Sequence, residues 1–329
     1  MEKLLIDRDG RQLNYLRVSV TDRCNFRCYY CMPEEGVNFV ERKELVSYEE
    51  LGELTLLFSR LGVNKIRITG GEPFVRKGIM SFLEQISKNP SIDQITVTSN
   101  GTLTPSQMHQ LKSLGILKIN ISMDSLDRQR FFDMTRRDRF DEVYGCVLEL
   151  MAAGFEVKLN CVVADGQNIS DIVPFIELTK NYPLSVRFLE EMPFNGKNTF
   201  ETPQWNHVAI FNHIEMHYPH LLKLRDEANG TSVNYKIPGY QGSFGIIPSF
   251  SRTFCGTCNR IRLSATGELR TCLYGPPATN LRDLIRSGAA METIEDEIIA
   301  IVAAREKDGF AAEALTKKSP KRSMSFLGG

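Results

Sequence analysis

Short apolar runs rich in β-branched residues recur along the first two-thirds of the chain, and amphipathic segments separate them. Runs of this length and composition predict β-strands. There are six of them, at Tyr15–Val20, Lys65–Thr69, Gln94–Thr98, Lys118–Ser122, Val157–Val163 and Ser185–Glu190.

The segments between these runs have the patterns of helices. Ser47 followed by Glu50 predicts a capping box at the start of a helix that ends near Arg60. Apolar residues at helical spacing predict another helix over Phe140–Ala153, which Gly154 would close. Strand-then-helix units in series favour an α/β fold with a parallel sheet, either doubly wound or part of a barrel.

The last third has a different pattern, because the alternation ends near Glu190. A region punctuated by Gly and Pro follows at Asn229–Tyr274. The helices predicted around it are Gln204–His217, Leu281–Arg286 and Glu292–Ala304. We therefore predict two parts with a boundary near Arg225, residues 1–225 and 226–329.

Charge is balanced over the 329 residues, with 40 Lys and Arg against 40 Asp and Glu. Proteins that hold duplex nucleic acid or an acidic membrane surface usually carry a basic surplus, so we expect neither partner. The longest purely apolar run, Ile298–Ala304, is far shorter than the roughly 18 residues that a membrane span needs. The first residues lack the pattern of a signal peptide, and we expect a soluble, cytoplasmic protein.

Three cysteines, Cys24, Cys28 and Cys31, follow the first predicted strand with the spacing C-x3-C-x2-C. Three thiolates this close can hold one metal centre. Structural zinc takes four ligands, and the nearest histidine, His109, is remote in sequence. A four-iron cluster on three thiolates would leave one iron open for a small molecule. The alternative is a zinc site with a distant fourth ligand.

A second group, Cys255, Cys258 and Cys272, also has three members and no histidine nearby. Between Ser251 and Cys272 there are four arginines and one acid, a local balance of +3 in a neutral protein. Guanidinium groups bind phosphate in a bidentate manner. This group therefore predicts a second open cluster beside a site for a phosphorylated substrate.

The first cysteine group, with Tyr30 inside it, and the sequence Gly70-Gly71-Glu72-Pro73 after the second strand resemble the radical S-adenosylmethionine (SAM) superfamily. The resemblance implies an α/β fold, a partial (β/α)6 TIM-like barrel, and a four-iron, four-sulfur (4Fe-4S) cluster with SAM bound to its open iron. Together with the second cysteine group, we expect a C-terminal α+β extension that carries a second iron–sulfur cluster, and thus two 4Fe-4S clusters as cofactors.

Four stretches are similar to the branch of that superfamily that cyclises GTP at the start of molybdenum cofactor biosynthesis. They are residues 16–28, residues 31–33, residues 254–263 and the terminal Gly328-Gly329. The resemblance implies a carbon–carbon-bond-forming lyase. In that branch, a 5′-deoxyadenosyl radical from SAM takes the 3′ hydrogen of GTP, and the product is (8S)-3′,8-cyclo-7,8-dihydroguanosine 5′-triphosphate.

The resemblance also implies roles for single residues. The cluster ligands would be Cys24, Cys28, Cys31, Cys255, Cys258 and Cys272, and the SAM contacts Tyr30, Gly71, Ser122 and Met192. The GTP contacts would be Arg17, Arg67, Thr98, Lys158, Arg187, Arg260, Ile261 and Arg262, with catalytic roles for Arg17, Gly328 and Gly329.

Each role has a structural alternative. Arg17 alternates with apolar neighbours and could lie on the outward face of its strand. Thr98 and Ser122 could only cap helices, and Met192 could fill the core. Cys146 and Cys161 have no partner motif and are expected to be buried as small hydrophobes.

Four histidines crowd one segment, and His213 and His217 could share a helix face. No H-E-x-x-H motif is present, so we do not expect a metal site at His207, His213, His217 and His220.

The resemblance further implies an electron donor of the flavodoxin or ferredoxin type, a homodimer, and transfer of the product to cyclic pyranopterin monophosphate synthase. Two other classes remain open. One is a radical SAM enzyme that modifies peptides with auxiliary clusters, and the other is a zinc-dependent nucleic-acid-binding protein, which zero net charge disfavours.

Overall fold

The computed structural model describes residues 3–194, 202–316 and 323–327. Its central feature is a 12-stranded sheet with the order β12-β11-β10-β1-β2-β3-β4-β5-β6-β9-β8-β7. The middle six strands are parallel and lie in chain order. They are β1 (Tyr15–Ser19), β2 (Lys65–Thr69), β3 (Gln94–Ser99), β4 (Lys118–Ser122), β5 (Glu156–Val163) and β6 (Ser185–Glu190). All six predicted strands are confirmed, to within one residue at their ends.

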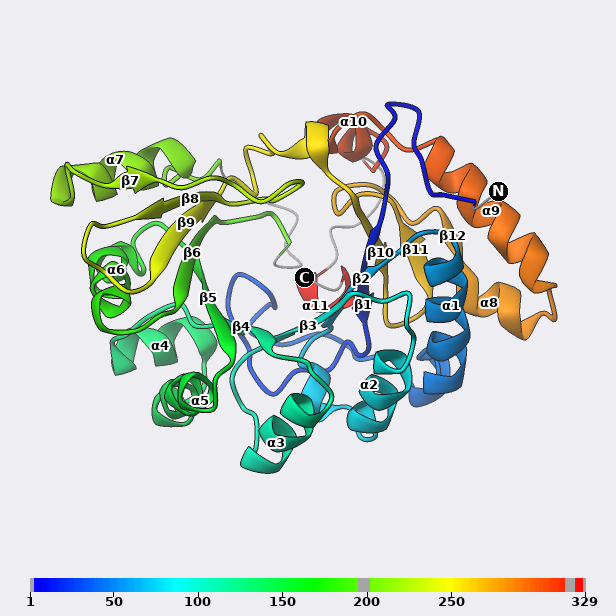
Figure 1. Ribbon diagram of the computed structural model, residues 1–329, viewed down its shortest axis with the longest axis horizontal. Coiled ribbons are helices and arrows are strands. Elements are labelled where there is room, and N and C mark those ends of the chain that lie inside the picture. Colours follow the sequence, from blue (N-terminus) through cyan, green and yellow to red (C-terminus); the bar gives the residue numbers. More distant parts are fainter. Residues whose placement is uncertain (1–2, 195–201, 317–322, 328–329) are drawn as a thin grey trace.

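Helices follow these strands and lie around the outside of the curved sheet (Figure 1). They are α1 (Tyr48–Arg60), α2 (Ile79–Ser87), α3 (Pro105–Ser113), α4 (Arg128–Thr135), α5 (Phe140–Ala152) and α6 (Ile172–Asn181). The predicted capping box starts α1, since Glu50 N donates to Ser47 Oγ at 3.1 Å and Ser47 N donates to Glu50 Oε2 at 2.7 Å. This arrangement confirms the partial (β/α)6 barrel.

The C-terminal segments extend the sheet at both edges. β10 (Arg260–Leu263) lies parallel to β1, and β11 (Glu268–Arg270) and β12 (Thr279–Asn280) follow it in antiparallel pairing. At the other edge, β9 (Ser243–Ile247) lies parallel to β6. The antiparallel strands β8 and β7 then close that edge, at Val233–Lys236 and Leu222–Lys223. One sheet therefore holds strands from both sides of residue 225, and the two-part division stays a prediction.

The remaining helices belong to the last third of the chain. They are α7 (His207–His217), α8 (Leu281–Arg286), α9 (Met291–Ala303), α10 (Gly309–Ala314) and α11 (Met324–Leu327). The helix predicted from Gln204 begins at His207, because the Asn206 side chain caps it by accepting from Val208 N and Ala209 N. The short helix α11 lies at the middle of the molecule (Figure 1).

The alternation of side chains along the strands decides where the core and the cavity lie. Leu16, Val18, Ile119 and Ile121 are fully buried and belong to the main hydrophobic core, which also contains residues of the surrounding helices. Barrel interiors are usually filled by branched apolar residues. Here the opposite side chains of the strands are mainly polar, so the inner face surrounds a cavity.

Within the described ranges, no helix combines the length and apolar character needed to cross a membrane. Cys146 and Cys161 are buried, as predicted.

Candidate active site

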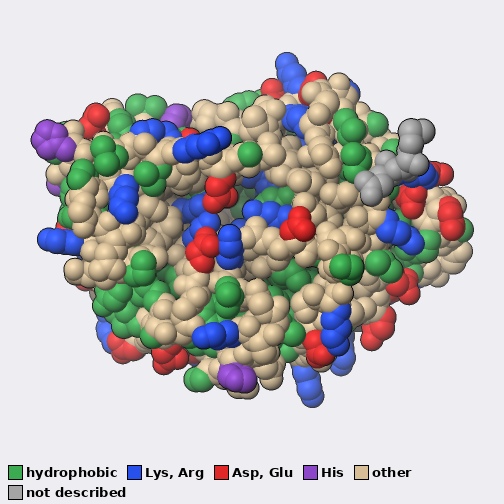
Figure 2. Space-filling view, in the orientation of Figure 1, with side chains coloured by type: hydrophobic (Ala, Val, Ile, Leu, Met, Phe, Trp, Pro, Cys, Tyr) green, Lys and Arg blue, Asp and Glu red, His purple; other side chains and the backbone are tan. Residues whose placement is uncertain are grey.

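One cavity of about 620 Å³ lies against the inner face of the sheet. Figure 2 shows this side of the molecule hollowed near its middle, with Lys and Arg side chains gathered around the hollow. Of the predicted site residues that the structure describes, all but one line this cavity. They include both cysteine groups, so segments more than 200 residues apart meet at one place.

Ile261 is the exception, because its side chain is fully buried in the hydrophobic core. Its neighbours Arg260 and Arg262 line the cavity, as alternation along β10 requires. A contact of Ile261 with a ligand in the cavity would therefore use its backbone.

Arg17 lies on the cavity side of β1, and its outward-face alternative is wrong. The apolar neighbours Leu16 and Val18 occupy the side that the helices cover, which leaves Arg17 facing inward.

The first cysteine group lies in the loop after β1. Cys31 N and Met32 N both donate to Cys28 O at 2.9 Å, so the loop turns back on itself and its free thiols line the cavity. Burial raises the pKa of Cys24 to about 11 and that of Cys31 to about 12. Without a bound positive group, these thiols remain protonated at neutral pH.

The Gly70-Gly71 loop packs against the backbone that carries this cysteine group. Gly71 N donates to Thr21 O at 2.7 Å, and Glu72 N donates to Arg23 O at 2.8 Å. A Cβ atom on Gly71 would lie 2.2 Å from Arg23 O. Gly71 is therefore required for close contact between the two loops, in addition to any approach to a ligand.

Tyr30 extends from the first cysteine group toward β4. Its hydroxyl donates to Asp124 Oδ2 at 2.7 Å, and Val162 N donates to Asp124 Oδ1 at 2.8 Å. Burial, followed by the charge of Asp124, raises the pKa of Tyr30 well above its usual range. Ser122, which ends β4, and Met192 line the same cavity.

The second cysteine group has positively charged neighbours. Arg305 Nη2 donates to Cys258 Sγ at 3.0 Å and Arg260 Nε donates to it at 3.3 Å. Burial raises the pKa of Cys258, but the charges of Arg260 and Arg305 outweigh burial and lower the pKa to about 6. Unlike Cys24 and Cys31, this cysteine is largely a thiolate at neutral pH.

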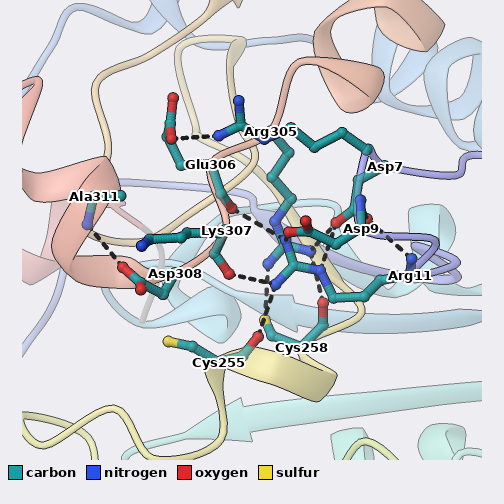
Figure 3. A network of polar contacts seen from close by, with 11 residues as sticks. Asp7, Asp9, Arg11, Cys255, Cys258, Arg305, Glu306, Lys307, Asp308 and Ala311 are labelled. Atoms are coloured by element: carbon teal, nitrogen blue, oxygen red, sulfur yellow. Dashed lines mark hydrogen bonds and ion pairs between the residues drawn. The ribbon is translucent and has the colours of Figure 1, made fainter.

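Two distant segments hold the loop of the second group in place (Figure 3). Arg11, in the N-terminal hairpin, donates through Nη1 to Cys255 O at 2.9 Å and to Lys307 O at 2.6 Å. Arg305, which follows α9, donates through Nη1 to Cys258 O at 2.6 Å. The cysteine loop is thus fixed through its carbonyl oxygens.

Three arginines form a row across three adjacent parallel strands. Arg17 is in register with Arg67 on one side and Arg262 on the other, and all three line the cavity. Burial, then the charge of Arg262, lowers the pKa of Arg17 well below its usual range. Like charges placed this close together favour a bound anion, which would offset their repulsion.

Two further guanidinium groups support an anion site. Arg187 Nε and Arg260 Nη2 are buried and have no hydrogen-bond partner in the part of the chain that the structure describes. A buried donor without a partner costs free energy, which a ligand oxygen would recover. Thr98 lies beside the arginine row and accepts a hydrogen bond from Arg67 Nη1 at 3.1 Å.

Several cavity residues were not predicted from the sequence. Tyr15, Lys65, Asn120 and Asn160 each lie two positions from a predicted residue on the same strand. Side chains two apart share one face of a strand, so this spacing would have found them. Arg305 and Glu227 have no comparable pattern, because they come from loops.

Tyr15 lies among the cavity cations. Its hydroxyl accepts a hydrogen bond from Arg67 Nε, and Lys65 Nζ lies 4.8 Å from the centre of its ring. Burial raises the pKa of Tyr15, but the charges of Arg67 and Arg17 outweigh burial and lower the pKa to about 7.

Lys158 also faces the cavity, where Glu227 Oε1 lies 3.5 Å from its Nζ. The Glu227 side chain is 64% exposed and belongs to a loop at the cavity. An acid therefore pairs with one of the cations predicted to bind substrate.

The described C-terminal residues lie between the two cysteine groups. Ser323 Oγ donates to Cys31 O, while Leu327 forms a small apolar cluster with Phe194 and Tyr274, against which Cys272 packs. The predicted catalytic residues Gly328 and Gly329 lie outside the described residues.

The cysteine groups do not form sites for a single ion. Among the described residues, no set of three or more His, Cys, Asp or Glu side chains is arranged to hold one metal ion. A four-iron cluster is wider than a single ion, so thiolates at its corners stand further apart than thiolates on one zinc. Each group places three free thiols along the cavity, and three thiolates are the number that would leave one iron of a four-iron cluster open.

The histidines of α7 make contacts with other side chains. His207 Nδ1 lies 2.9 Å from Glu190 Oε1, and the rings of His213 and His217 lie 4.7 Å apart on the helix.

Comparisons with known proteins show which families this chain resembles. The family model described as Radical SAM superfamily matches residues 18–179, and the model described as Molybdenum Cofactor Synthesis C matches residues 184–311. The crystal structure of SuiB from Streptococcus suis has the same fold, with a TM-score of 0.63 at 12% identity over 96% of this chain and 77% of that one.

Curated relatives match over most of this chain. The protein named GTP 3',8-cyclase, mitochondrial, from Arabidopsis thaliana is 38% identical over 99% of this chain and 84% of its own length. Molybdenum cofactor biosynthesis protein moc-5 of Caenorhabditis elegans is 44% identical over 88% of this chain. This chain spans only 48% of that relative's length. The match to the plant protein covers well over two thirds of both chains, and the chain therefore belongs to the GTP 3',8-cyclase family of radical SAM enzymes.

Proposed function

We propose that this protein converts GTP to (8S)-3′,8-cyclo-7,8-dihydroguanosine 5′-triphosphate in the first step of molybdenum cofactor biosynthesis. The observation that carries the proposal is the row of Arg67, Arg17 and Arg262, which faces a cavity lined by two separate groups of three thiols. A polyanion fits the arginine row, and open clusters fit the thiols.

The first cysteine group would hold a 4Fe-4S cluster through Cys24, Cys28 and Cys31. When bound, this cluster and SAM supply the 5′-deoxyadenosyl radical that removes the 3′ hydrogen of GTP. The chain would bind SAM through Tyr30, Gly71, Ser122 and Met192, of which Tyr30 is held in place by Asp124.

The GTP triphosphate would bind to the cationic side chains of the inner face. The substrate residues are Arg17, Arg67, Thr98, Lys158, Arg187, Arg260 and Arg262, with Ile261 through its backbone. Their task is to fix the ribose close to the bound SAM and to balance the phosphate charge, and Arg17 would also guide the nucleotide during the reaction.

The second cysteine group would hold a second 4Fe-4S cluster through Cys255, Cys258 and Cys272, with the guanine base at its open iron. The three thiols line the cavity, and the guanidinium groups of Arg260 and Arg305 beside the Cys258 sulfur would balance the negative charge of cysteine ligands on a cluster.

Other parts of the proposal rest on family resemblance. They are the electron donor of the flavodoxin or ferredoxin type, a homodimer, transfer of the product to cyclic pyranopterin monophosphate synthase, and the catalytic role of Gly328 and Gly329. The cellular compartment stays a prediction, since one relative is named mitochondrial.

An anaerobic assay tests the function. The protein, reconstituted with iron and sulfide, is mixed with SAM, a strong reductant and GTP, and the products are identified by mass spectrometry. We expect about eight irons per chain, and 5′-deoxyadenosine together with the cyclised nucleotide when GTP is present. A colourless zinc protein, or one that cleaves SAM without converting GTP, would overturn the proposal.

A further inference from the structure

We propose that Arg305, held by Asp7, is a positioning residue of the second cysteine group: it donates a hydrogen bond to the Cys258 sulfur and thereby raises the reduction potential of the cluster there. The inference rests on the proposed function, since it requires the second 4Fe-4S cluster. Neither the cysteine motif nor the family resemblance of the sequence points to Arg305.

Arg305 contacts Cys258 at two atoms. Nη2 donates to the sulfur at 3.0 Å and Nη1 donates to the carbonyl oxygen of the same residue at 2.6 Å (Figure 3). A guanidinium group that holds both ends of one residue fixes the direction of its side chain. The cysteine sulfur is thereby oriented before any iron binds.

Arg305 is itself held in place. Its side chain is 4% exposed, and its backbone N–H donates to Val302 O at the end of α9. A buried cation needs an opposite charge nearby, and the fully buried carboxylate of Asp7 lies 3.7 Å from Nη1.

Asp7 is fixed by the N-terminal hairpin. Its carboxylate accepts from Asp9 N at 3.0 Å, from Arg11 N at 2.9 Å and from Arg11 Nε at 2.6 Å. The N-terminal hairpin thus holds the Asp7 carboxylate in place. Asp7 orients Arg305, and Arg305 orients the thiol of Cys258.

The hydrogen bond from Arg305 would also affect the reduction potential of a bound cluster. Hydrogen bonds to cluster sulfurs are among the factors that set an iron–sulfur potential. The reduced cluster carries more negative charge, so a cationic donor stabilises the reduced form and raises the potential. At the first group, the hydrogen bonds to Cys24 Sγ come from neutral donors, Phe26 N at 3.4 Å and Asn100 Nδ2 at 3.8 Å.

The test measures both cluster potentials by redox titration with electron paramagnetic resonance, in the reconstituted full chain. Arg305→Met removes the charge and the donors, while Arg305→Lys keeps the charge but loses the two-point contact. Arg8→Met is the matched control, because it removes a nearby positive charge that pairs with Glu306, while the contacts of Arg8 with the described residues include neither Asp7 nor the cysteine loop.

We expect Arg305→Met to lower the potential of the second cluster. A tenfold change in the one-electron equilibrium corresponds to about 59 mV. Arg305→Lys should give a smaller shift. The potential of the first cluster should not change in either variant, and Arg8→Met should leave both potentials unchanged. Because Arg305→Met could prevent assembly of the second cluster, Arg305→Lys gives an independent measurement.

The outcomes separate this inference from the proposed function. A second cluster with an unchanged potential in Arg305→Met, or in Arg305→Lys where the first variant does not assemble, overturns the role of Arg305 and leaves the function intact. A wild-type chain that binds only about four irons overturns the second cluster, and the inference with it.

Discussion

The two cysteine groups line the same cavity but have opposite electrostatic surroundings. Near the first group, burial and the carboxylates of Glu72 and Asp124 keep the thiols protonated. Near the second, Arg260 and Arg305 favour the thiolate of Cys258. One side of the cavity is thus suited to a neutral or cationic ligand and the other to a polyanion.

Cysteine spacing therefore does not determine the chemistry of a site by itself. Both groups have three members, but the neighbouring strands supply their charges. The row of Arg67, Arg17 and Arg262 exists because β10, from the last third of the chain, pairs in register with β1.

The strongest test of the difference between the two cysteine groups removes one cysteine ligand from each group, in two separate variants. Cys28→Ala should abolish formation of 5′-deoxyadenosine, since the first group would lose its cluster. Cys272→Ala should keep about half of the iron but form no cyclised nucleotide. Iron analysis and product analysis measure both effects. Cys161→Ala is the control, and SAM cleavage at wild-type rate in Cys28→Ala would contradict the division of roles.

The second prediction concerns the side of the cavity that carries the row of Arg67, Arg17 and Arg262. Arg262→Ala should weaken GTP binding by about 10- to 100-fold, because a hydrogen bond to a charged group contributes about 1.5–3 kcal/mol. Equilibrium binding of GTP measures the effect. Arg27→Ala is the matched control at the first group, where Arg27 Nη1 donates to Cys24 O at 2.6 Å. Equal losses in the two variants would contradict the assignment of GTP to one side.

Two tyrosines report the charge on each side of the cavity. The pKa of Tyr15 is lowered to about 7, whereas that of Tyr30 is raised well above its usual range. The near-ultraviolet absorbance of phenolate should therefore rise as the pH passes about 7, and Tyr15→Phe should remove this step. Tyr30→Phe should leave it unchanged.

The same titration affects stability. A depressed pKa in the folded state stabilises the wild type relative to Tyr15→Phe as the pH rises from about 7 toward 10, and this gain is lost as the pH falls through about 7. Denaturant unfolding at a series of pH values measures it. A step near pH 7 that persists in Tyr15→Phe would contradict the assignment.

The smallest expected effect concerns Glu227, which pairs with Lys158 at 3.5 Å. Glu227→Gln should tighten GTP binding by at most about fivefold, because an exposed ion pair contributes about 0.2–1 kcal/mol. Glu84→Gln, which removes the partner of Lys88 away from the cavity, serves as the control. Weaker GTP binding in Glu227→Gln would show that this acid supports the site instead of competing with the phosphates.

Sequence patterns were enough to predict the six central strands, the capping box at Ser47 and both cysteine groups. These features are local: a strand is specified by a few β-branched residues, a helix start by hydroxyl and carboxylate groups three positions apart, and a cluster motif by close cysteines. They could be predicted because the physical interactions that produce them span few residues.

Which face of each strand lines the cavity depends on how the helices pack against the sheet. Alternation divides a strand into two faces, but the packing of the outer helices buries the apolar face and leaves Arg17 inside and Ile261 outside. Long-range contacts were equally hidden in the sequence. Arg11 and Cys255 are 244 positions apart, and Arg305 meets Cys258 through a loop with no motif. Such contacts depend on how the whole chain folds back on itself, which no short pattern encodes.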